Sequence, residues 1–192
     1  MKVLTILGAR PQFVKAAPVS EQFRMAGFKE VIVNTGQHYD FNLSELFFQE
    51  LNIPKSKYDL KIGSGSHGFQ TGEMLKRLEP IFDKEKPDLA LVYGDTNSTL
   101  AGALVASKKN IHIAHIEAGL RSYNRIMPEE INRIITDNIS TLLFCPSNVS
   151  KSNLKKEGIV KNVFVVGDVM YDIFKKFEYE IDKKIIMVII VC

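Results

Sequence analysis

The sequence predicts an α/β fold built on a doubly wound, parallel, Rossmann-like sheet. Its 192 residues are 45% hydrophobic and 24% charged, which is the composition of an ordinary globular domain. Short apolar runs rich in Val and Ile recur along the chain without polar alternation, as expected for strands buried on both faces. Longer helical patterns separate these runs. Alternation of buried strands and helices is typical of a parallel sheet covered by helices on both sides.

The elements follow from the chain in order. Six apolar runs are the expected strands: Val3–Leu7, Val31–Asn34, Leu89–Tyr93, Ile111–Ile116, Leu142–Cys145 and Val163–Val166. Six segments between or after them are the expected helices: Pro11–Met25, Phe41–Leu51, Gln70–Phe82, Ser98–Lys108, Pro128–Ser140 and Val149–Glu157. Pro11 and Pro128 suit the first turn of a helix, Ser147 can cap the last helix, and Gly27 ends the first. The stretch from Pro54 to His67, which contains GSGSHG, is expected to be a mobile loop.

Several classes of protein are excluded by composition and motif. The 25 Lys and Arg against 22 Asp and Glu give a net charge of only +3 without a basic stripe, so no nucleic-acid partner is expected. No apolar run approaches the roughly 20 residues of a membrane span, and the N-terminus is not a signal peptide. The two cysteines form no disulfide framework or zinc motif, which favours the cytoplasm. The turn after the first expected strand, GARPQ, is not a dinucleotide-binding GxGxxG motif, and no GxxxxGK[ST] phosphate loop occurs, so we expect no metal, no nicotinamide and no other cofactor.

Polar side chains gather where four of the expected strands end, at the edge where ligands bind in such sheets. The four segments are Gly8–Gln12 with Lys15, Thr35–Asp40, Gly94–Thr99 and Glu117–Ser122. Each could be a simple turn or helix cap; Asp95, for example, could cap the helix that follows it. All four together favour a functional crevice, because a folded rim needs no His, Asp, Glu and Arg.

The segment from Met127 to Arg133 adds two carboxylates at the start of a helix. Glu129 and Glu130 could serve only the helix dipole, or one helical face could point a carboxylate into the crevice. Glu130 and Arg133 share a face at i and i+3. Asp137, four residues after Arg133, is expected to pair with that arginine.

Three histidines differ in their expected positions. His112 and His115 are expected on opposite faces of the sheet, with His112 the more ordinary of the two. His38 follows a glycine-containing turn at the carboxyl end of a strand, where a structural and a functional role are equally open.

Six motifs in this order resemble the N-terminal half of the non-hydrolysing UDP-N-acetylglucosamine 2-epimerases: GARPQFVK, TGQHYD, VYGDTNSTLAG, HIEAGLRS, MPEEINR and GDVMYD. The resemblance implies the N-terminal domain of a GT-B-type fold, with the active site between two domains. It implies reversible inversion at C2 of UDP-GlcNAc to UDP-ManNAc, by elimination and re-addition of UDP, for surface polysaccharides. It also implies that the full-length proteins are homodimers.

The resemblance assigns roles residue by residue. Asp95, Glu117 and Glu129 correspond to the acidic catalytic residues. Arg10, Lys15, Gln37, His38 and Arg133 correspond to residues that bind the UDP-sugar. The segment QHYDFN departs from the QHR of the best-known bacterial branch, which puts an allosteric UDP-sugar site in doubt and leaves a UDP-diacetamido uronic acid open as the substrate.

The resemblance covers residues 1–173, which we expect to form one domain. Residues 174–192 end in IIMVIIVC, which is either a last buried strand or the result of a truncation or frameshift near Lys184. Family members are roughly twice as long, and their C-terminal half supplies further UDP contacts. This chain alone is therefore expected to be poorly active, and a non-catalytic truncated paralogue, a glycosyltransferase and a hydrolysing epimerase remain alternatives.

Overall fold

The computed structural model describes residues 1–37 and 55–178. Its described strands form one sheet in the order β3-β2-β1-β4-β5-β6-β7, and every neighbouring pair is parallel. The strands are β1 (Lys2–Leu7), β2 (Lys29–Asn34), β3 (Tyr58–Asp59), β4 (Leu89–Tyr93), β5 (His112–Ile116), β6 (Leu142–Cys145) and β7 (Val163–Val165). This order confirms the doubly wound, Rossmann-like sheet.

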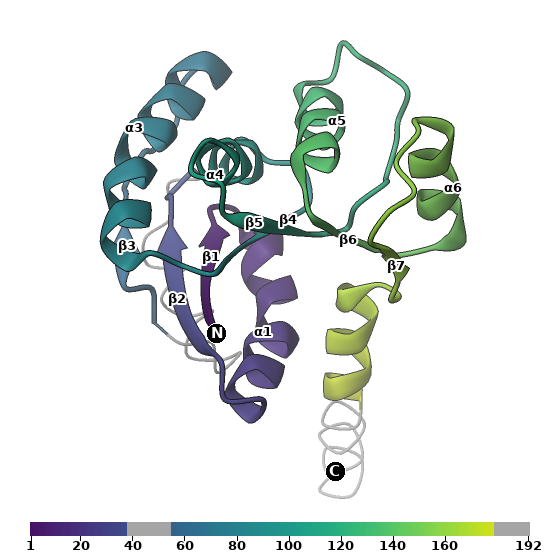
Figure 1. Ribbon diagram of the computed structural model, residues 1–192, viewed down its shortest axis with the longest axis horizontal. Helices are drawn as coiled ribbons and strands as arrows, with labels where there is room; N and C mark the ends of the chain where they lie inside the picture. Colours follow the sequence, from purple (N-terminus) through teal and green to yellow (C-terminus); the bar gives the residue numbers. More distant parts are fainter. Residues whose placement is uncertain (38–54, 179–192) are drawn as a thin grey trace, which may run out of the picture.

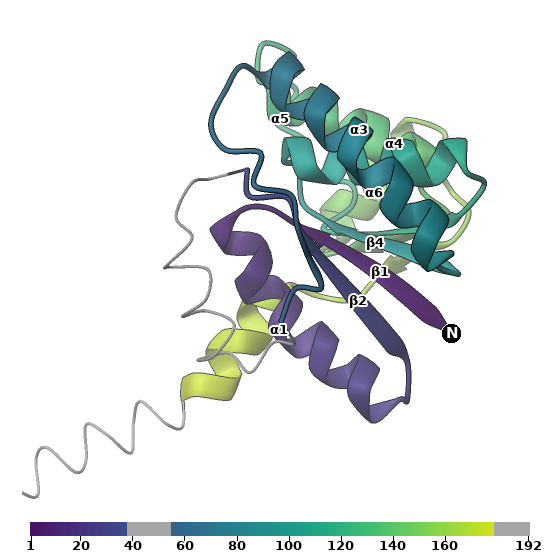
Figure 2. The same cartoon turned by 90° about the vertical axis from the view of Figure 1, so that its left-hand side faces the viewer.

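The helices lie on both faces of the sheet (Figure 1). They are α1 (Arg10–Met25), α3 (His67–Glu85), α4 (Asn97–Lys108), α5 (Pro128–Ile139), α6 (Asn148–Lys156) and the helical residues 169–178. Figure 2 shows α3, α4, α5 and α6 on one face, with α1 and the helical residues 169–178 on the other. Because all neighbouring strands are parallel, the turns that lead from the strands into the following segments lie at one edge of the sheet, the carboxyl edge.

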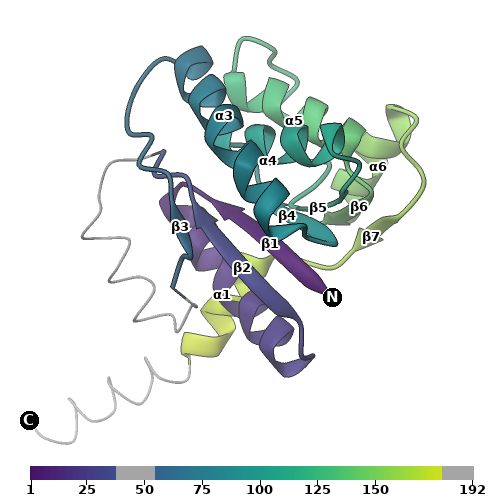
Figure 3. The same cartoon turned by 60° about the vertical axis from the view of Figure 1, so that its left-hand side comes forward.

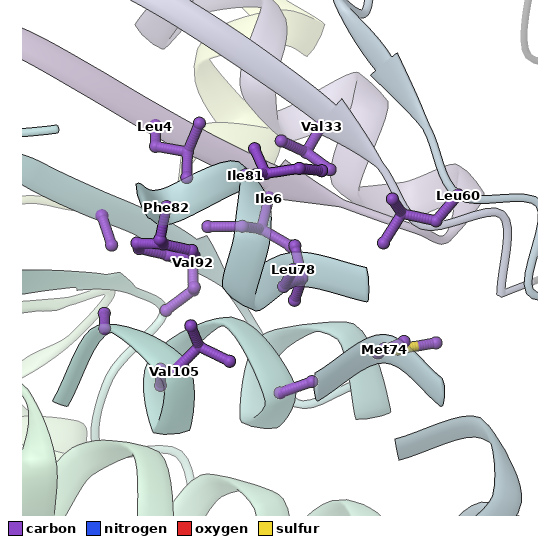
Figure 4. Packing of buried hydrophobic residues seen from close by; sticks show 14 of the residues in the cluster. Leu4, Ile6, Val33, Leu60, Met74, Leu78, Ile81, Phe82, Val92 and Val105 are labelled. Atoms are coloured by element: carbon purple, nitrogen blue, oxygen red, sulfur yellow. The ribbon is translucent and has the colours of Figure 1, made fainter. Parts of the chain in front are cut away.

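Two apolar layers hold the helices to the sheet. On the α3 and α4 side, Leu78 and Phe82 pack against Ile6 and Val92 of the central strands (Figure 4). On the other side, Phe13 of α1 packs with Leu7, and Val169 and Ile173 of the last helical segment join the same cluster. Leu4 and Ile6 of β1 belong to one layer and Val3 and Leu7 to the other, which explains why both faces of the strand are mainly apolar.

Most expected elements are confirmed with shifts of one to three residues at their ends. The two-residue strand β3 was missed, because an edge strand this short has no apolar run to mark it (Figure 3). Helix α3 begins at His67 rather than Gln70, because the Ser66 hydroxyl accepts a hydrogen bond from the Phe69 N–H at 3.4 Å and caps it.

Three expectations about segments stay predictions. The helix expected at Phe41–Leu51, His38 and the tail from residue 179 onward lie outside the described residues. The helical residues 169–178 cross the domain boundary expected after residue 173, and Lys176 pairs with Glu21 of α1 at 2.6 Å. None of the described helices is both long enough and apolar enough to cross a membrane.

Candidate functional site

The turn after β4 presents Asp95 to the crevice rather than using it as a helix cap. Thr96 is the N-cap of α4, and its hydroxyl accepts from the Thr99 N–H at 3.3 Å, so the capping role suggested for Asp95 was wrong. The Asp95 carboxylate instead accepts a hydrogen bond from the Arg133 guanidinium at 2.5 Å. Asp95 is thus held by a cation that comes from α5.

Glu117 directly follows β5 in an unusual backbone conformation. Its φ is +72°, in the left-handed region that a non-glycine residue adopts at a cost of about 1–3 kcal/mol. Its carboxylate accepts a hydrogen bond from the Lys15 ammonium of α1. The same carboxylate lies 3.1 Å from the place where a Cβ on Gly94 would stand, so that a glycine there leaves room for it. Glu117 therefore lies beside the turn that carries Asp95.

The start of α5 gives its two neighbouring carboxylates different environments. Glu130 is buried and accepts from the N–H groups of Ser122 and Tyr123 and from Arg133 at 2.8–2.9 Å. Burial alone would raise the pKa of Glu130, but these hydrogen bonds lower it below its usual range. Glu129 instead lines a cavity. The face of α5 that carries Glu129 therefore points a carboxylate into the crevice. Glu130 instead holds the preceding loop.

An open cavity of about 330 Å³ lies where these elements meet. Its polar lining includes the expected residues Gln37, Asp95 and Glu129, together with Asn97 and Asn132. The Gln37 side-chain oxygen accepts from both the backbone N–H and the hydroxyl of Ser98, at 3.0 and 2.8 Å. The cavity therefore joins β2, β4 and α5 at the carboxyl edge of the sheet.

Sequence reasoning missed four residues of this lining, Ser64, Gly65, His67 and Gln70. The Gln70 amide donates to the carbonyls of Gly63 and Gln37 at 2.7 and 3.3 Å, and Asn97 donates to the Gln70 side chain at 2.9 Å. The GSGSHG stretch, expected to be a loop, was the signal for the first three, and Gln70 was expected only as the first residue of a helix.

The remaining expected residues are placed as follows. Arg10 is the exposed first residue of α1, Lys15 follows one turn later, and Arg133 lies between Asp95 and Glu130. The pairing expected between Asp137 and Arg133 is wrong, because Asp137 points to β5 and its following loop, where it contacts His115 and Arg121 at 2.7 Å each. Within residues 1–37 and 55–178, no group of three His, Cys, Asp or Glu side chains could hold a metal ion.

The arrangement suits proton transfer to and from a ligand that carries negative charge. Three carboxylates of similar chemistry, Asp95, Glu117 and Glu129, come from three neighbouring elements. Two of them already contact cations, Arg133 and Lys15, which can stabilise developing negative charge. Carboxylates in such a setting can act as general acids or bases.

Comparison with known proteins identifies the family and the fold of this chain. A family model for UDP-N-acetylglucosamine 2-epimerase matches residues 21–189. A UDP-N-acetylglucosamine 2-epimerase homolog of Methanococcus maripaludis is 65% identical over 172 residues, which are 90% of this chain and 48% of the relative. The UDP-2,3-diacetamido-2,3-dideoxy-D-glucuronate 2-epimerase of Pseudomonas aeruginosa is 58% identical over 176 residues, 90% of this chain and 50% of that protein.

Among solved structures, the Methanocaldococcus jannaschii UDP-GlcNAc 2-epimerase in complex with UDP-GlcNAc and UDP superposes with a TM-score of 0.89 at 51% identity. The match covers 92% of this chain and 49% of that one. The chain thus spans about half the length of these relatives, and its fold is the N-terminal domain of their GT-B-type architecture. This chain belongs to the UDP-N-acetylglucosamine 2-epimerase family.

Proposed function

We propose that this chain is the N-terminal catalytic half of a non-hydrolysing UDP-GlcNAc 2-epimerase that interconverts UDP-GlcNAc and UDP-ManNAc. The observation that carries the proposal is the placement of three carboxylates at one edge of the sheet. Asp95 and Glu129 line the same cavity, and Glu117 lies beside Gly94, the residue before Asp95. Arg133 pairs with Asp95, and Lys15 pairs with Glu117. The M. jannaschii relative, whose structure contains UDP-GlcNAc and UDP, supports the substrate class.

The reaction inverts C2 without a net change in oxidation state. A carboxylate takes the C2 proton, the electron pair of the C–H bond forms the C1–C2 double bond, and the anomeric C–O bond breaks to release UDP. A carboxylic acid then returns a proton to the opposite face of the 2-acetamidoglucal, and UDP adds again at C1. Because C2–H is a very weak acid, loss of the leaving group must accompany proton removal.

We assign the steps of this reaction to residues by the chemistry of their side chains. We assign proton removal and return to Asp95, Glu117 and Glu129 as a group. Lys15 and Arg133, together with Arg10, meet the charge of the diphosphate, while Gln37 and His38 line the sugar side. His38 enters this assignment from its motif alone, since it lies outside the described residues.

The domain boundary, the compartment and the assembly belong to the same proposal. We place the domain at residues 1–173, the tail at 174–192 and the reaction in the cytoplasm. We expect the 192-residue chain alone to turn over poorly, because the other half of the cleft supplies further UDP contacts. The homodimer implied by the family would be measured by light scattering.

The test is a chimera in which residues 1–173 replace the corresponding half of the M. jannaschii enzyme. Proton NMR in deuterated water should show loss of the C2 proton signal of UDP-GlcNAc and appearance of UDP-ManNAc. Asp95→Asn and Glu117→Gln should each lower the rate by about 100-fold to 10,000-fold, the usual contribution of an acid–base group. Glu73→Gln, which alters an exposed ion pair with Arg77 on α3, should leave the rate unchanged.

Other outcomes point to the alternatives. Release of free sugar would indicate a hydrolysing epimerase, and a folded chimera that exchanges no C2 proton would favour a non-catalytic paralogue. The 58% identity to the P. aeruginosa enzyme makes UDP-2,3-diacetamido-2,3-dideoxy-D-glucuronate the second substrate to assay. Faster exchange with that sugar would keep the mechanism and change the substrate.

A further inference from the structure

His115 lies on β5, two residues before Glu117, and its side chain is fully buried. Its Nδ1 atom is 2.7 Å from the carboxylate of Asp137 on α5. Its Nε2 atom is 2.7 Å from the carbonyl oxygen of Gly94, the residue before Asp95. One imidazole therefore bridges the turn that carries Asp95 and the helix that follows the Glu117 loop.

The partners determine which ring atoms carry protons. A backbone carbonyl can only accept, so Nε2 must donate to Gly94. Asp137 also accepts from the Gly119 N–H at 3.1 Å and from Arg121 at 2.7 Å, an arrangement that suits a carboxylate. Burial by itself would raise the pKa of Asp137, but His115 and Arg121 lower it below its usual value. The geometry thus places an acceptor opposite each ring nitrogen, the Asp137 carboxylate at Nδ1 and the Gly94 carbonyl at Nε2.

The loop after β5 is fixed by the same carboxylate. Besides Asp137, Arg121 contacts Glu157 at the end of α6 through two hydrogen bonds of 2.7 Å. The Gly119 carbonyl accepts from Asn153 of α6 at 3.0 Å. Residues 117–121 are thus held on two sides, which explains how Glu117 retains its left-handed backbone.

We propose that His115 is a positioning residue, which bridges Gly94 and Asp137 through its two ring nitrogens and thereby fixes the Gly94–Asp95 turn relative to the Glu117 loop. The inference rests on the proposed function only for the roles of Asp95 and Glu117 in catalysis. The structural link itself can be tested without any sugar nucleotide, so its failure is distinguishable from failure of the proposed reaction.

Two substitutions separate the two contacts. The amide nitrogen of Asn can replace Nδ1, so His115→Asn keeps the donor toward Asp137 and loses the donor toward Gly94. The longer Gln side chain can replace Nε2, so His115→Gln keeps the donor toward Gly94. Both variants lose the imidazole, so a residue that only filled space would respond alike to either change.

The readout is hydrogen exchange of backbone amides, followed by NMR. The Gly94 N–H donates to the Ile116 carbonyl at 2.9 Å and reports on the turn, while the amide of Leu91 in the middle of β4 reports on general unfolding. His115→Asn should raise the exchange of Gly94 relative to Leu91 by about tenfold, and His115→Gln by no more than about twofold. Equal changes in both variants, or none, would overturn the proposal.

The ring itself gives an independent signature. In the unmodified chain, the nitrogen chemical shifts of His115 should report a proton on Nε2, the atom that faces the Gly94 carbonyl. His112, exposed on the same strand, provides the reference signal, and His112→Gln should leave the His115 signals and the Gly94 exchange unchanged. A His115 Nε2 without a proton would contradict the proposal.

Discussion

At the scale of single residues, Glu117 combines a chemical role with a strained backbone. A left-handed conformation costs an L-residue with a Cβ roughly 1–2 kcal/mol, and glycine avoids this cost. We therefore expect Glu117→Gly to have a free energy of unfolding higher than Glu117→Gln by about 1 kcal/mol, although both lose the carboxylate. Urea denaturation of the two variants measures this difference.

The comparison with Gln is the matched one, because both variants lose the contact between Glu117 and Lys15. This ion pair is partly buried and contributes to stability itself, so comparison with the unmodified chain would mix the loss of the pair with the relief of backbone strain. If Glu117→Gln is as stable as Glu117→Gly, the φ of +72° carries no strain, and the surrounding loop accommodates a side chain freely.

At the scale of elements, sequence patterns predicted the strands and helices but not every contact between them. The apolar run Leu89–Tyr93 and the proline at the start of α5 are local signals, and both elements appear where expected. The i, i+4 spacing predicted the wrong partner for Asp137. Its partners in the structure, His115 and Arg121, lie 22 and 16 residues away along the chain. Contacts of this kind depend on how strands and helices are assembled, which no i, i+4 rule contains.

The candidate site shows the same division. The positions after each strand were predictable, because parallel strands place their carboxyl ends at one edge. That Glu129, and not Glu130, lines the cavity follows only from the loop at Ser122 and Tyr123, which occupies Glu130. His67 and Gln70 join the lining because α3 begins three residues earlier than its apolar pattern suggests.

The loop after β5 lies against α6 at Gly119, and a substitution of this glycine tests how much the contact contributes to stability. A Cβ on Gly119 would stand 2.3 Å from the Ser150 carbonyl oxygen of α6, and its φ is +79°. Gly119→Ala should therefore lower the free energy of unfolding by more than about 2 kcal/mol, because the backbone of α6 must move and the φ is strained. Thermal and urea unfolding measure the loss.

Gly158 is the matched control for this substitution. Its φ is +82°, but a Cβ there would meet nothing within 4 Å. Gly158→Ala should cost only the backbone strain, about 1 kcal/mol. Equal losses for the two variants would show that the close approach of loop and helix contributes nothing beyond the left-handed backbone.

At the scale of the whole molecule, the two ends of the strands serve different purposes. The carboxyl ends carry the crevice, whereas at the amino ends Glu85 of α3 joins two strands of the sheet. Its carboxylate accepts from Lys57 and Tyr58 at 2.6 Å each and lies 3.3 Å from the ammonium of Lys2. These contacts bring together the start of β1, the start of β3 and the end of α3, and none of them lies in the site.

The contacts of Glu85 make the free energy of unfolding depend on pH in the acid range. Hydrogen bonds from Lys57 and Tyr58 lower the pKa of Glu85 to about 2, whereas an unfolded chain holds a glutamate near 4.3. A lowered pKa in the folded state adds stability above the unfolded value, and this stability is lost as the pH falls toward 2. Glu85→Gln should thus unfold at a lower urea concentration than the parent at about pH 7, and this difference should narrow steadily between about pH 5 and pH 3.

The exposed pair of Glu73 and Arg77 supplies the control, and Glu73→Gln should show no comparable difference. If the difference in unfolding urea between Glu85→Gln and the parent stays constant with pH, the effect comes from packing rather than charge. If Glu85→Gln in the chimera loses C2 exchange, the two ends of the sheet do not have separate roles.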